Sequence, residues 1–199
     1  MQISNLQKSF KKKQVLKDIN LTTEPGQLIH IAGRNGSGKS TIFKIITGLL
    51  KADSGSITFD NNTYIGALIE NPGFLEYETG LSNLQFLANL RNNYNEEKVL
   101  QLLKFFYLDP NDQQAIRKYS IGMRQKIGII QAVMEDQNLI LFDEPTRGLD
   151  PDSIHQFASL LKKLKEEGKT IIVASHDEIP EIPYTHFYKL SDGVLVDEN

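Results

Sequence analysis

The chain has 199 residues, of which 22 are Lys or Arg and 25 are Asp or Glu, and its formal net charge is -3. This slightly acidic balance argues against a dedicated nucleic-acid binder, whose binding face is usually strongly basic. The chain contains no cysteine, which excludes disulfide scaffolds and cysteine-ligated metal sites. Its apolar runs are far shorter than the ~18–20 residues that cross a bilayer, so we expect one cytoplasmic domain with a sizeable core.

Short apolar runs alternate with turn residues in the first third of the chain, which predicts strands. The expected strands are Ile3–Phe10, Ile19–Thr23, Leu28–Ala32, Ser56–Phe59 and Tyr64–Ile69, and apolar spacing predicts a helix over Thr41–Leu50. A glycine-rich loop joins the third strand to this helix. Strand, loop and helix in that order are typical of an α/β nucleotide-binding fold.

Apolar residues recur at three and four positions through residues 72–137, which predicts a block of helices. Beyond it we expect strands at Leu139–Phe142 and Thr170–Ala174, a helix over Asp152–Glu167, and a hairpin of Phe187–Leu190 and Val194–Val196. The sequence thus predicts the α/β class, within one domain covering residues 1–199. Its core is expected at residues 1–71 and 138–199, with the helical block inserted at residues 72–137.

The glycine-rich loop, Gly33–Ser40, fits the pattern G-x-x-x-x-G-K-[S/T] between a strand and a helix. Its glycines let backbone N–H groups approach a phosphate chain, and the helix N-terminus attracts negative charge. Lys39 is expected to neutralise the β- and γ-phosphates, and the hydroxyl of Ser40 to bind Mg²⁺. A chance glycine-rich turn is the alternative, and the correct flanking elements argue against it.

Two acids, Asp143 and Glu144, follow the apolar run Leu139–Phe142. Adjacent carboxylates at the end of a buried strand are costly without partners, and a metal facing them removes that cost. We expect Asp143 to support Mg²⁺, and Glu144 to orient the attacking water or accept its proton. A strand that simply ends in an acidic loop is the bland alternative.

His176 follows another apolar strand, and parallel strands would bring it to the sheet edge that holds Gly33 and Asp143. The other three histidines, His30, His155 and His186, are interpreted as packed or surface residues. Further back, Tyr119–Lys126 opens a helix with a serine cap, a start that suits either a second phosphate or an ordinary capped helix.

Taken together, these motifs resemble the ATPase subunit of an ATP-binding cassette (ABC) transporter over essentially the whole chain. The resemblance implies a P-loop NTPase (RecA-like) core with an N-terminal antiparallel β subdomain and an inserted helical subdomain. The Walker A residues are Gly33, Arg34, Asn35, Gly36, Ser37, Gly38, Lys39, Ser40 and Thr41, and Walker B runs from Leu139 to Glu144. Ser120, Gly122 and Met123 match the signature motif, Asp150 the D-loop, and His176 the switch histidine. Phe10, ahead of Val15, lies where the family stacks an aromatic ring on adenine.

Two positions depart from the family pattern. The signature reads YSIGM where LSGGQ is usual, so Ile121 replaces a glycine and Met123 a glutamine. Glu70 stands where the family's Q-loop has glutamine; with Ser40 and Asp143 it is expected on the Mg²⁺ side of the site, adding negative charge beside a triphosphate. The local sequence IENPGF resembles that of the bacitracin and lantibiotic self-protection exporters of Gram-positive bacteria.

The resemblance implies a mechanism and partners. Two ATP molecules are held between two such chains, so a homodimer forms on ATP binding and hydrolysis reopens it, driving a separately encoded membrane permease. The chain is then peripheral on the inner face of the cell membrane, and the implied cargo is an antimicrobial peptide, a drug or another hydrophobic substrate. Catalysis would use Glu144, His176 and Lys39.

Two other functions are alternatives to transport. A non-transport ABC ATPase, serving the ribosome or an assembly pathway, keeps the chemistry and removes the permease. A GTP-binding switch needs an N-K-x-D element, and the sequence has no Asn-Lys pair.

For the permease we expect a docking surface at Pro72–Tyr77. The alternative is that Phe74 and Leu75 pack the core of the helical block.

Overall fold

The computed structural model describes residues 1–11 and 13–198. Its strands are β1 (Gln2–Phe10), β2 (Lys13–Thr22), β3 (Leu28–Ala32), β4 (Ser54–Thr58), β5 (Ile65–Leu68), β6 (Leu139–Asp143), β7 (Thr170–Ser175), β8 (His186–Ser191) and β9 (Val194–Asp197). Its helices are α1 (Lys39–Ile46), α2 (Gly80–Asn89), α3 (Glu96–Phe105), α4 (Ile121–Val133) and α5 (Pro151–Glu166), with a 3₁₀ turn, η1, at Ile116–Lys118. Among the described residues, the strands form one sheet in the order β4-β1-β2-β9-β8-β3-β7-β6-β5.

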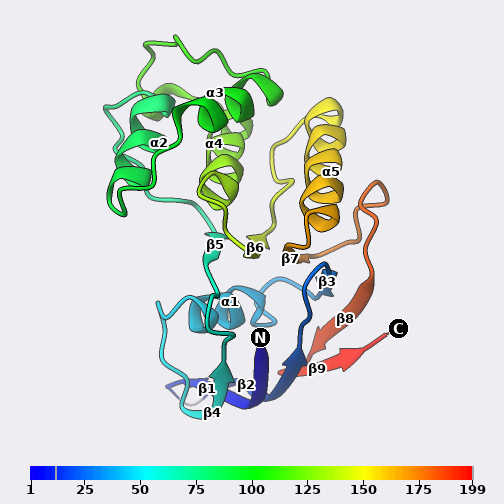
Figure 1. Ribbon diagram of the computed structural model, residues 1–199. Coiled ribbons are helices and arrows are strands. Elements are labelled where there is room, and N and C mark those ends of the chain that lie inside the picture. The colour runs from blue at the N-terminus through cyan, green and yellow to red at the C-terminus, as the bar shows by residue number, and fades with distance from the viewer. Residues whose placement is uncertain (12, 199) are drawn as a thin grey trace.

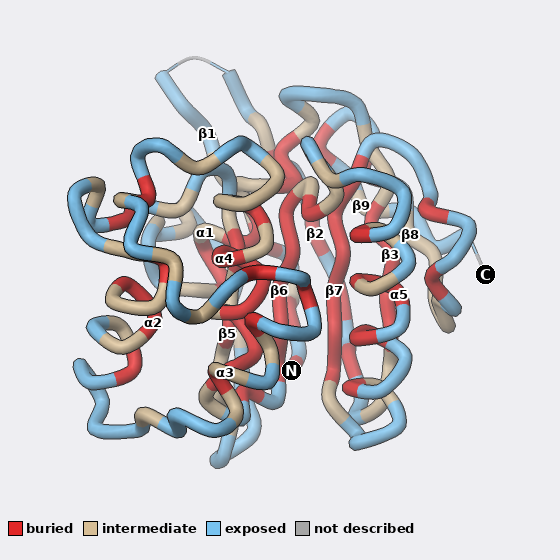
Figure 2. The backbone as a smooth tube through the Cα atoms, turned by 90° about the horizontal axis from the view of Figure 1, so that it is seen from above, coloured by how far each residue is buried: buried red, intermediate tan, exposed pale blue. Residues whose placement is uncertain are grey.

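The centre of the sheet is parallel and is covered on both faces. β3 pairs with β7, and β7 with β6, in parallel register. In β6, Ile140 and Phe142 belong to the core that contains α4 and α5, whereas Leu139 and Leu141 belong to the core that contains α1. Figure 2 shows β6 and β7 buried along their length in the middle of the molecule. A strand packed on both faces needs an unbroken apolar run, which explains why these strands were predicted correctly.

The N-terminal strands form an antiparallel region, with β1 pairing to both β2 and β4. Figure 1 shows this region at the end of the molecule opposite α2, α3 and α4. The predicted strand at Ile19–Thr23 was too short, because β2 begins at Lys13. Buried Leu16 and Ile19 are three residues apart, and the register shifts between β1 and β2 break the alternation that marks a strand.

Helix α1 also differs from its prediction, because it begins at Lys39 and ends at Ile46, before the expected Leu50. Gly48 has a φ of 76°, in the left-handed region that commonly ends helices. Its N–H donates to Ile45 O at 3.1 Å. The helix therefore spans only the turns that follow the glycine-rich loop.

The block at residues 72–137 contains α2, α3, η1 and α4, as predicted for its secondary structure. Thr79, Asn95 and Ser120 cap the three α-helices, each accepting a hydrogen bond from a backbone N–H three residues on. Their apolar faces join a core shared with α5 and β6. The division of the chain into a core and a helical subdomain remains a prediction.

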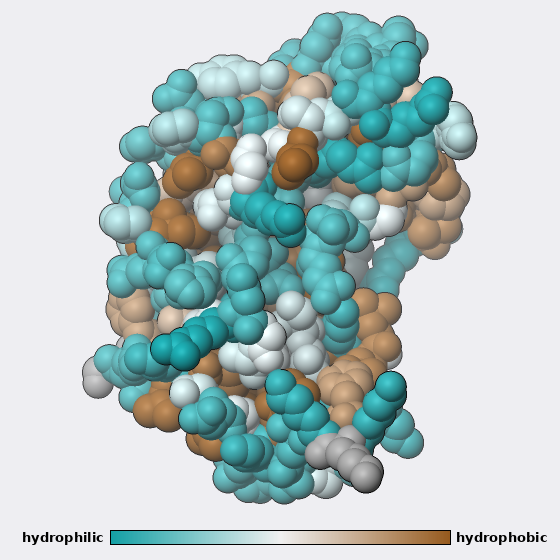
Figure 3. All heavy atoms as spheres, turned by 180° about the vertical axis from the view of Figure 1, so that it is seen from behind, coloured by the Kyte–Doolittle hydropathy of each residue, from teal (hydrophilic) through white to brown (hydrophobic). Residues whose placement is uncertain are grey.

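Phe74 lies in this shared core and is only 9% exposed, so its expected role in a docking surface is wrong. Leu75 and Tyr77 of the same segment are exposed, at 42% and 78%. Figure 3 shows hydrophobic side chains in separate patches among polar ones on the face seen from behind. Within the described ranges, no helix is long and apolar enough to cross a membrane.

Candidate functional site

The predicted site residues follow the carboxyl ends of neighbouring strands. In the parallel register, Ala32 of β3 lies beside Ser175 of β7, and Asp143 of β6 beside Ala174. The glycine-rich loop, Glu144 and His176 therefore leave the sheet at the same edge, as expected. This is the edge where open α/β sheets bind ligands.

The glycine-rich loop turns directly into α1 through Gly38, whose φ is 114°. A Cβ at this position would lie 2.8 Å from Leu16 Cδ2 and 3.0 Å from Val15 Cγ1, so both backbone angle and packing require glycine. The first amides of α1 have no partner within the helix. They give the loop a concentration of N–H donors suited to an anion.

A pocket of about 510 Å³ lies between this loop and the ends of β5 and β6. Its lining comprises Val15, Asn35, Gly36, Gly38, Lys39, Ser40, Thr41, Glu70, Asn71, Gln125, Asp143, Glu144 and Arg147. Most of the predicted phosphate and metal residues are thus brought together in one chain. The lining does not include six other predicted site residues, namely Phe10, Ser120, Gly122, Met123, Asp150 and His176.

Lys39 and Glu144 form the charged centre of the pocket. Lys39 Nζ lies 3.3 Å from Glu144 Oε1 and donates to Gly33 O at 2.6 Å, and the lysine side chain is 5% exposed. Glu144 Oε1 is buried and accepts no hydrogen bond from the described residues, so the contact is an ion pair without hydrogen-bond alignment. Glu144 also has a φ of 49°, an uncommon conformation for a residue with a side chain. The Glu144 carboxylate thus lines the pocket, and its Oε1 atom is available to accept a hydrogen bond from a ligand or water.

Asp143 is 4% exposed and is hydrogen-bonded to the Ser40 side chain. Burial raises the pKa of this carboxyl, the hydrogen bond from Ser40 lowers it, and the charge of Glu144 raises it again. A bound cation would relieve this cost. Hydroxyl and carboxylate oxygens are the ligands that Mg²⁺ takes, with water and phosphate filling the rest. Within the part of the chain that the structure describes, no group of three or more His, Cys, Asp or Glu could hold a metal ion.

Gln125 was missed by the sequence reasoning. Its side chain is 8% exposed, and its Nε2 donates to Glu144 O at 3.1 Å and to Pro145 O at 2.9 Å. It thereby ties α4 to the backbone that carries Glu144. The signal was available, because a glutamine among the buried positions of an apolar helix requires a polar partner.

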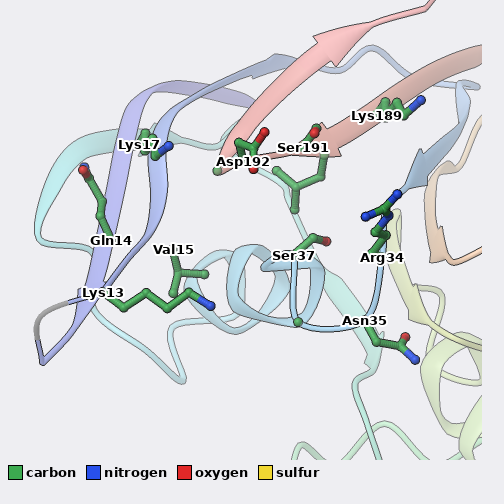
Figure 4. A pocket seen from close by; sticks show the side chains of 14 residues that line it. Lys13, Gln14, Val15, Lys17, Arg34, Asn35, Ser37, Lys189, Ser191 and Asp192 are labelled. Atoms are coloured by element: carbon green, nitrogen blue, oxygen red, sulfur yellow. The ribbon is translucent and has the colours of Figure 1, made fainter.

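A second pocket, of about 640 Å³, lies beside the first and shares Val15, Asn35 and Gly36 with it. Figure 4 shows its side chains coming from β2, from the glycine-rich loop and from the β8–β9 turn. Arg34 and Ser37 line this pocket, together with three lysines, Lys13, Lys17 and Lys189. Four cationic side chains and one carboxylate, Asp192, give this side of the loop a positive field that attracts polyphosphates.

The two histidines near this edge differ. His176 is exposed, and its Nδ1 lies 3.0 Å from Asp177 Oδ2. His30 is 3% exposed, as its interpretation as a packed histidine predicts, and burial lowers its pKa. The Ser175 hydroxyl donates to Asp177 O at 2.7 Å, so at the 2.8 Å contact His30 Nε2 is the donor to Ser175 Oγ. His30 therefore supports the turn from Ser175 to Asp177, which contains His176.

The signature residues lie outside the pocket, at the N-terminus of α4. Ser120 is exposed, and its Oγ accepts from Met123 N at 3.1 Å. A Cβ on Gly122 would lie 2.5 Å from Gly148 O, so the start of α4 packs closely against the segment that leads to Asp150. Asp150 caps α5 by accepting from Ser153 N at 2.8 Å, and that hydrogen bond lowers its pKa. Within one chain, Ser120 and Asp150 cap their own helices, and none of these residues lines the phosphate pocket.

Comparison with known proteins gives three relatives of note. The chain is 38% identical to an uncharacterized ABC transporter ATP-binding protein, YdbJ, of Bacillus subtilis; the match covers 88% of this chain and 61% of that protein. It is 34% identical to the lantibiotic transport ATP-binding protein SrtF of Streptococcus pyogenes, over 88% of this chain and 80% of the relative. It is 35% identical to the bacitracin transport ATP-binding protein BcrA of Enterococcus faecalis, over 100% of this chain and 68% of that protein. The chain thus spans about two thirds of the length of several of the relatives it matches.

Solved structures agree with the fold. A dimeric structure of a bacterial ABC transporter cassette has a TM-score of 0.85 and 27% identity, covering 100% of this chain and 96% of its own. A nucleotide-free cassette from an ABC transporter has a TM-score of 0.80 and 25% identity, covering 98% and 88%. The profile of the ABC transporter family matches residues 16–147. With the phosphate loop and the paired acids in place, the chain belongs to the ABC transporter family, as an ATP-binding cassette that hydrolyses ATP.

Proposed function

We propose that this chain hydrolyses MgATP between two copies of itself and uses the resulting movement to drive a separate membrane permease. The observation that carries the proposal is the pocket in which Lys39, Ser40, Asp143 and Glu144 converge beside an N-terminal helix end. This set supplies a phosphate-binding cation, oxygen ligands and a base within one cavity.

The phosphates are proposed to lie against the amides of the loop from Gly36 to Lys39, with the Lys39 ammonium on the β- and γ-phosphates. Binding would then replace the Lys39–Glu144 ion pair and free the Glu144 carboxylate. Ser40 and Asp143 would hold Mg²⁺, which neutralises phosphate charge. The nucleoside end is proposed to reach Val15 and Phe10.

Glu144 would orient a water whose oxygen attacks the γ-phosphorus, while the bond from that phosphorus to the β-phosphate oxygen breaks. The water proton passes to Glu144, and ADP and phosphate leave. His176 is proposed to contact the γ-phosphate only after closure, because its side chain is exposed and lies outside the lining. Gln125 would hold the Glu144 backbone in place.

The second half of the site is proposed to come from another copy. Ser120, Gly122 and Met123 begin a helix whose N-terminus faces solvent in this chain, and the similar dimeric cassette provides a precedent for pairing. ATP would then join the two chains and hydrolysis would release them.

Export of an antimicrobial peptide, a drug or another hydrophobic substrate is supported by the similarity to proteins named for lantibiotic and bacitracin transport. Among the residues first expected to dock, Leu75 and Tyr77 remain exposed and are proposed to contact the permease. The guanidinium carbon of Arg117 lies 4.7 Å from the centroid of the Tyr77 ring, and this contact holds the ring at the surface.

The test co-expresses this chain with a candidate permease chosen from the open reading frames next to its gene. Replacing Leu75 and Tyr77 by Ser should abolish co-purification with that permease and leave ATP binding unchanged, because both side chains are exposed. A matched control replaces exposed Tyr107 by Ser. Loss of ATP binding together with co-purification would show that the pair supports the fold, and unchanged co-purification would remove the docking proposal.

A further inference from the structure

Glu70 is the third carboxylate of the phosphate pocket and the one that the proposed chemistry leaves without a clear task. It follows β5, has a φ of 53° and lines the pocket together with Ser40, Asp143 and Glu144. Glu144 is paired with the Lys39 cation, and Asp143 is hydrogen-bonded to Ser40. A free carboxylate at Glu70 would face a triphosphate with like charge.

Glu70 is balanced from outside the pocket. Lys44 Nζ donates to Glu70 Oε1 at 2.7 Å, although Lys44 itself does not line the cavity. Lys44 lies four residues after Ser40 on α1, one turn along the same helix face. The lysine is 35% exposed and the glutamate 56%, so the pair is partly screened by water but is adjacent to the pocket wall.

We propose that Lys44 is a positioning residue for the ATPase reaction. It holds the Glu70 carboxylate and cancels its charge, so that the pocket accepts a nucleoside triphosphate although three carboxylates line it. This rests on the proposed placement of the triphosphate against Lys39. The pair then acts as one neutral, hydrogen-bonding side of the pocket, anchored to the helix that begins at the phosphates.

The alternative within the same geometry is that Lys44 attracts phosphate directly. The two roles differ in how they depend on Glu70. If Lys44 acts through Glu70, removing both charges restores binding. If Lys44 acts on phosphate itself, removing both leaves binding as weak as removing the lysine alone.

The experiment measures equilibrium binding of ATP, with EDTA present to exclude metal, for Lys44→Met, Glu70→Gln and the double variant. Lys44→Met should weaken binding about fivefold, because an unbalanced carboxylate then faces the phosphates. Glu70→Gln should bind ATP more tightly than the unsubstituted chain, because it removes a carboxylate from the pocket and keeps the Lys44 charge. The double variant should recover most of the affinity lost in Lys44→Met, and Lys44→Arg should keep its affinity. The matched control is Lys51→Met, an exposed lysine just beyond α1 for which the described residues show no ion pair.

Steady-state kinetics with Mg²⁺ provides the second readout. Lys44→Met should raise KM and leave kcat within about twofold, because the reacting groups are untouched. Equal binding by Lys44→Met and Lys51→Met would overturn the inference, and so would a double variant as weak as Lys44→Met. Lys39→Ala separates the two proposals. Normal ATP binding by Lys39→Ala would contradict the proposed placement of the triphosphate. If Lys39→Ala loses ATP binding and Lys44→Met does not, only the role of the Lys44–Glu70 pair is contradicted.

Discussion

The two halves of the proposed ATP site differ in how completely one chain builds them. The phosphate half is enclosed, with Lys39 and Asp143 almost fully buried and an ion pair already formed to Glu144. The signature half is exposed: Ser120 and Asp150 each accept one backbone hydrogen bond and face solvent. Buried charges destabilise the fold unless a ligand or partner compensates them, whereas a capped helix end is stable without one. This difference is the basis for the proposal that one half binds nucleotide alone and that the other acts only in a dimer.

The largest effect is expected from Glu144→Gln. Removing the base should lower kcat by about 10²–10⁴-fold, while ATP binding persists because the phosphate contacts remain. Turnover assays and size-exclusion chromatography with ATP would measure both properties, and dimers should accumulate. Turnover near that of the unsubstituted chain would move the base to another residue, with His176 and Glu70 as the next candidates.

A substitution in the other half should separate binding from turnover. Gly122→Ala places a Cβ 2.5 Å from Gly148 O, so the start of α4 must shift. We expect turnover to fall by at least about tenfold. The ATP affinity of the single chain should remain within about twofold, because neither Gly122 nor Gly148 lines the phosphate pocket. A parallel loss of monomer affinity would contradict the division into two halves. Gly73→Ala, where a Cβ meets nothing within 4 Å, is the control.

Gln125→Ala tests the link between the halves, since this residue joins α4 to the Glu144 backbone. The buried carbonyl of Pro145 and the partly buried carbonyl of Glu144 lose their donor. The free energy of unfolding should therefore fall by about 1–3 kcal/mol. Urea denaturation measures that loss, and a fall in kcat at unchanged KM would indicate a positioning role. A variant with unaltered stability and kcat would show that the contact is incidental.

The smallest effect concerns Glu76, which receives two hydrogen bonds from Arg124 of α4, at 2.6 and 2.9 Å. Arg124 lowers the pKa of Glu76, so the pair stabilises the fold above the ordinary carboxyl pKa and loses this effect as pH falls through the lowered pKa. Glu76→Gln should therefore lower the melting temperature slightly at pH 7, and the difference should shrink as the pH is lowered through the acidic range. A difference that does not depend on pH would assign the effect to packing.

The predicted features share one property, which is that they are encoded locally. The loop at Gly33–Ser40 and the run before Asp143 each carry their pattern within a few residues, so position and chemistry could be inferred together. The start of β2 was missed because its bulges disrupt the alternation of buried residues. Phe74 was misassigned because its burial depends on the shared core of α4 and α5, to which no local pattern points.

The contacts of Gln125 and Lys44 lie between elements far apart in sequence. Gln125 meets Glu144 at a separation of 19 residues, and Lys44 meets Glu70 at 26. A glutamine or a lysine on a helix is ordinary in isolation, and only the packed fold assigns each its partner. The signature residues present the opposite case, because their predicted role requires a second chain.

A mixing experiment tests the central claim most directly, namely that one chain supplies only half of each ATP site. Glu144→Gln disables the phosphate half, and Ser120→Arg blocks the signature half with a bulky cation. Each variant alone should be nearly inactive. Mixed in equal amounts before ATP is added, they should recover up to about a quarter of normal ATPase activity, because half the dimers are mixed and each holds one intact site. Activity no greater than the sum of the two separate variants would contradict the claim.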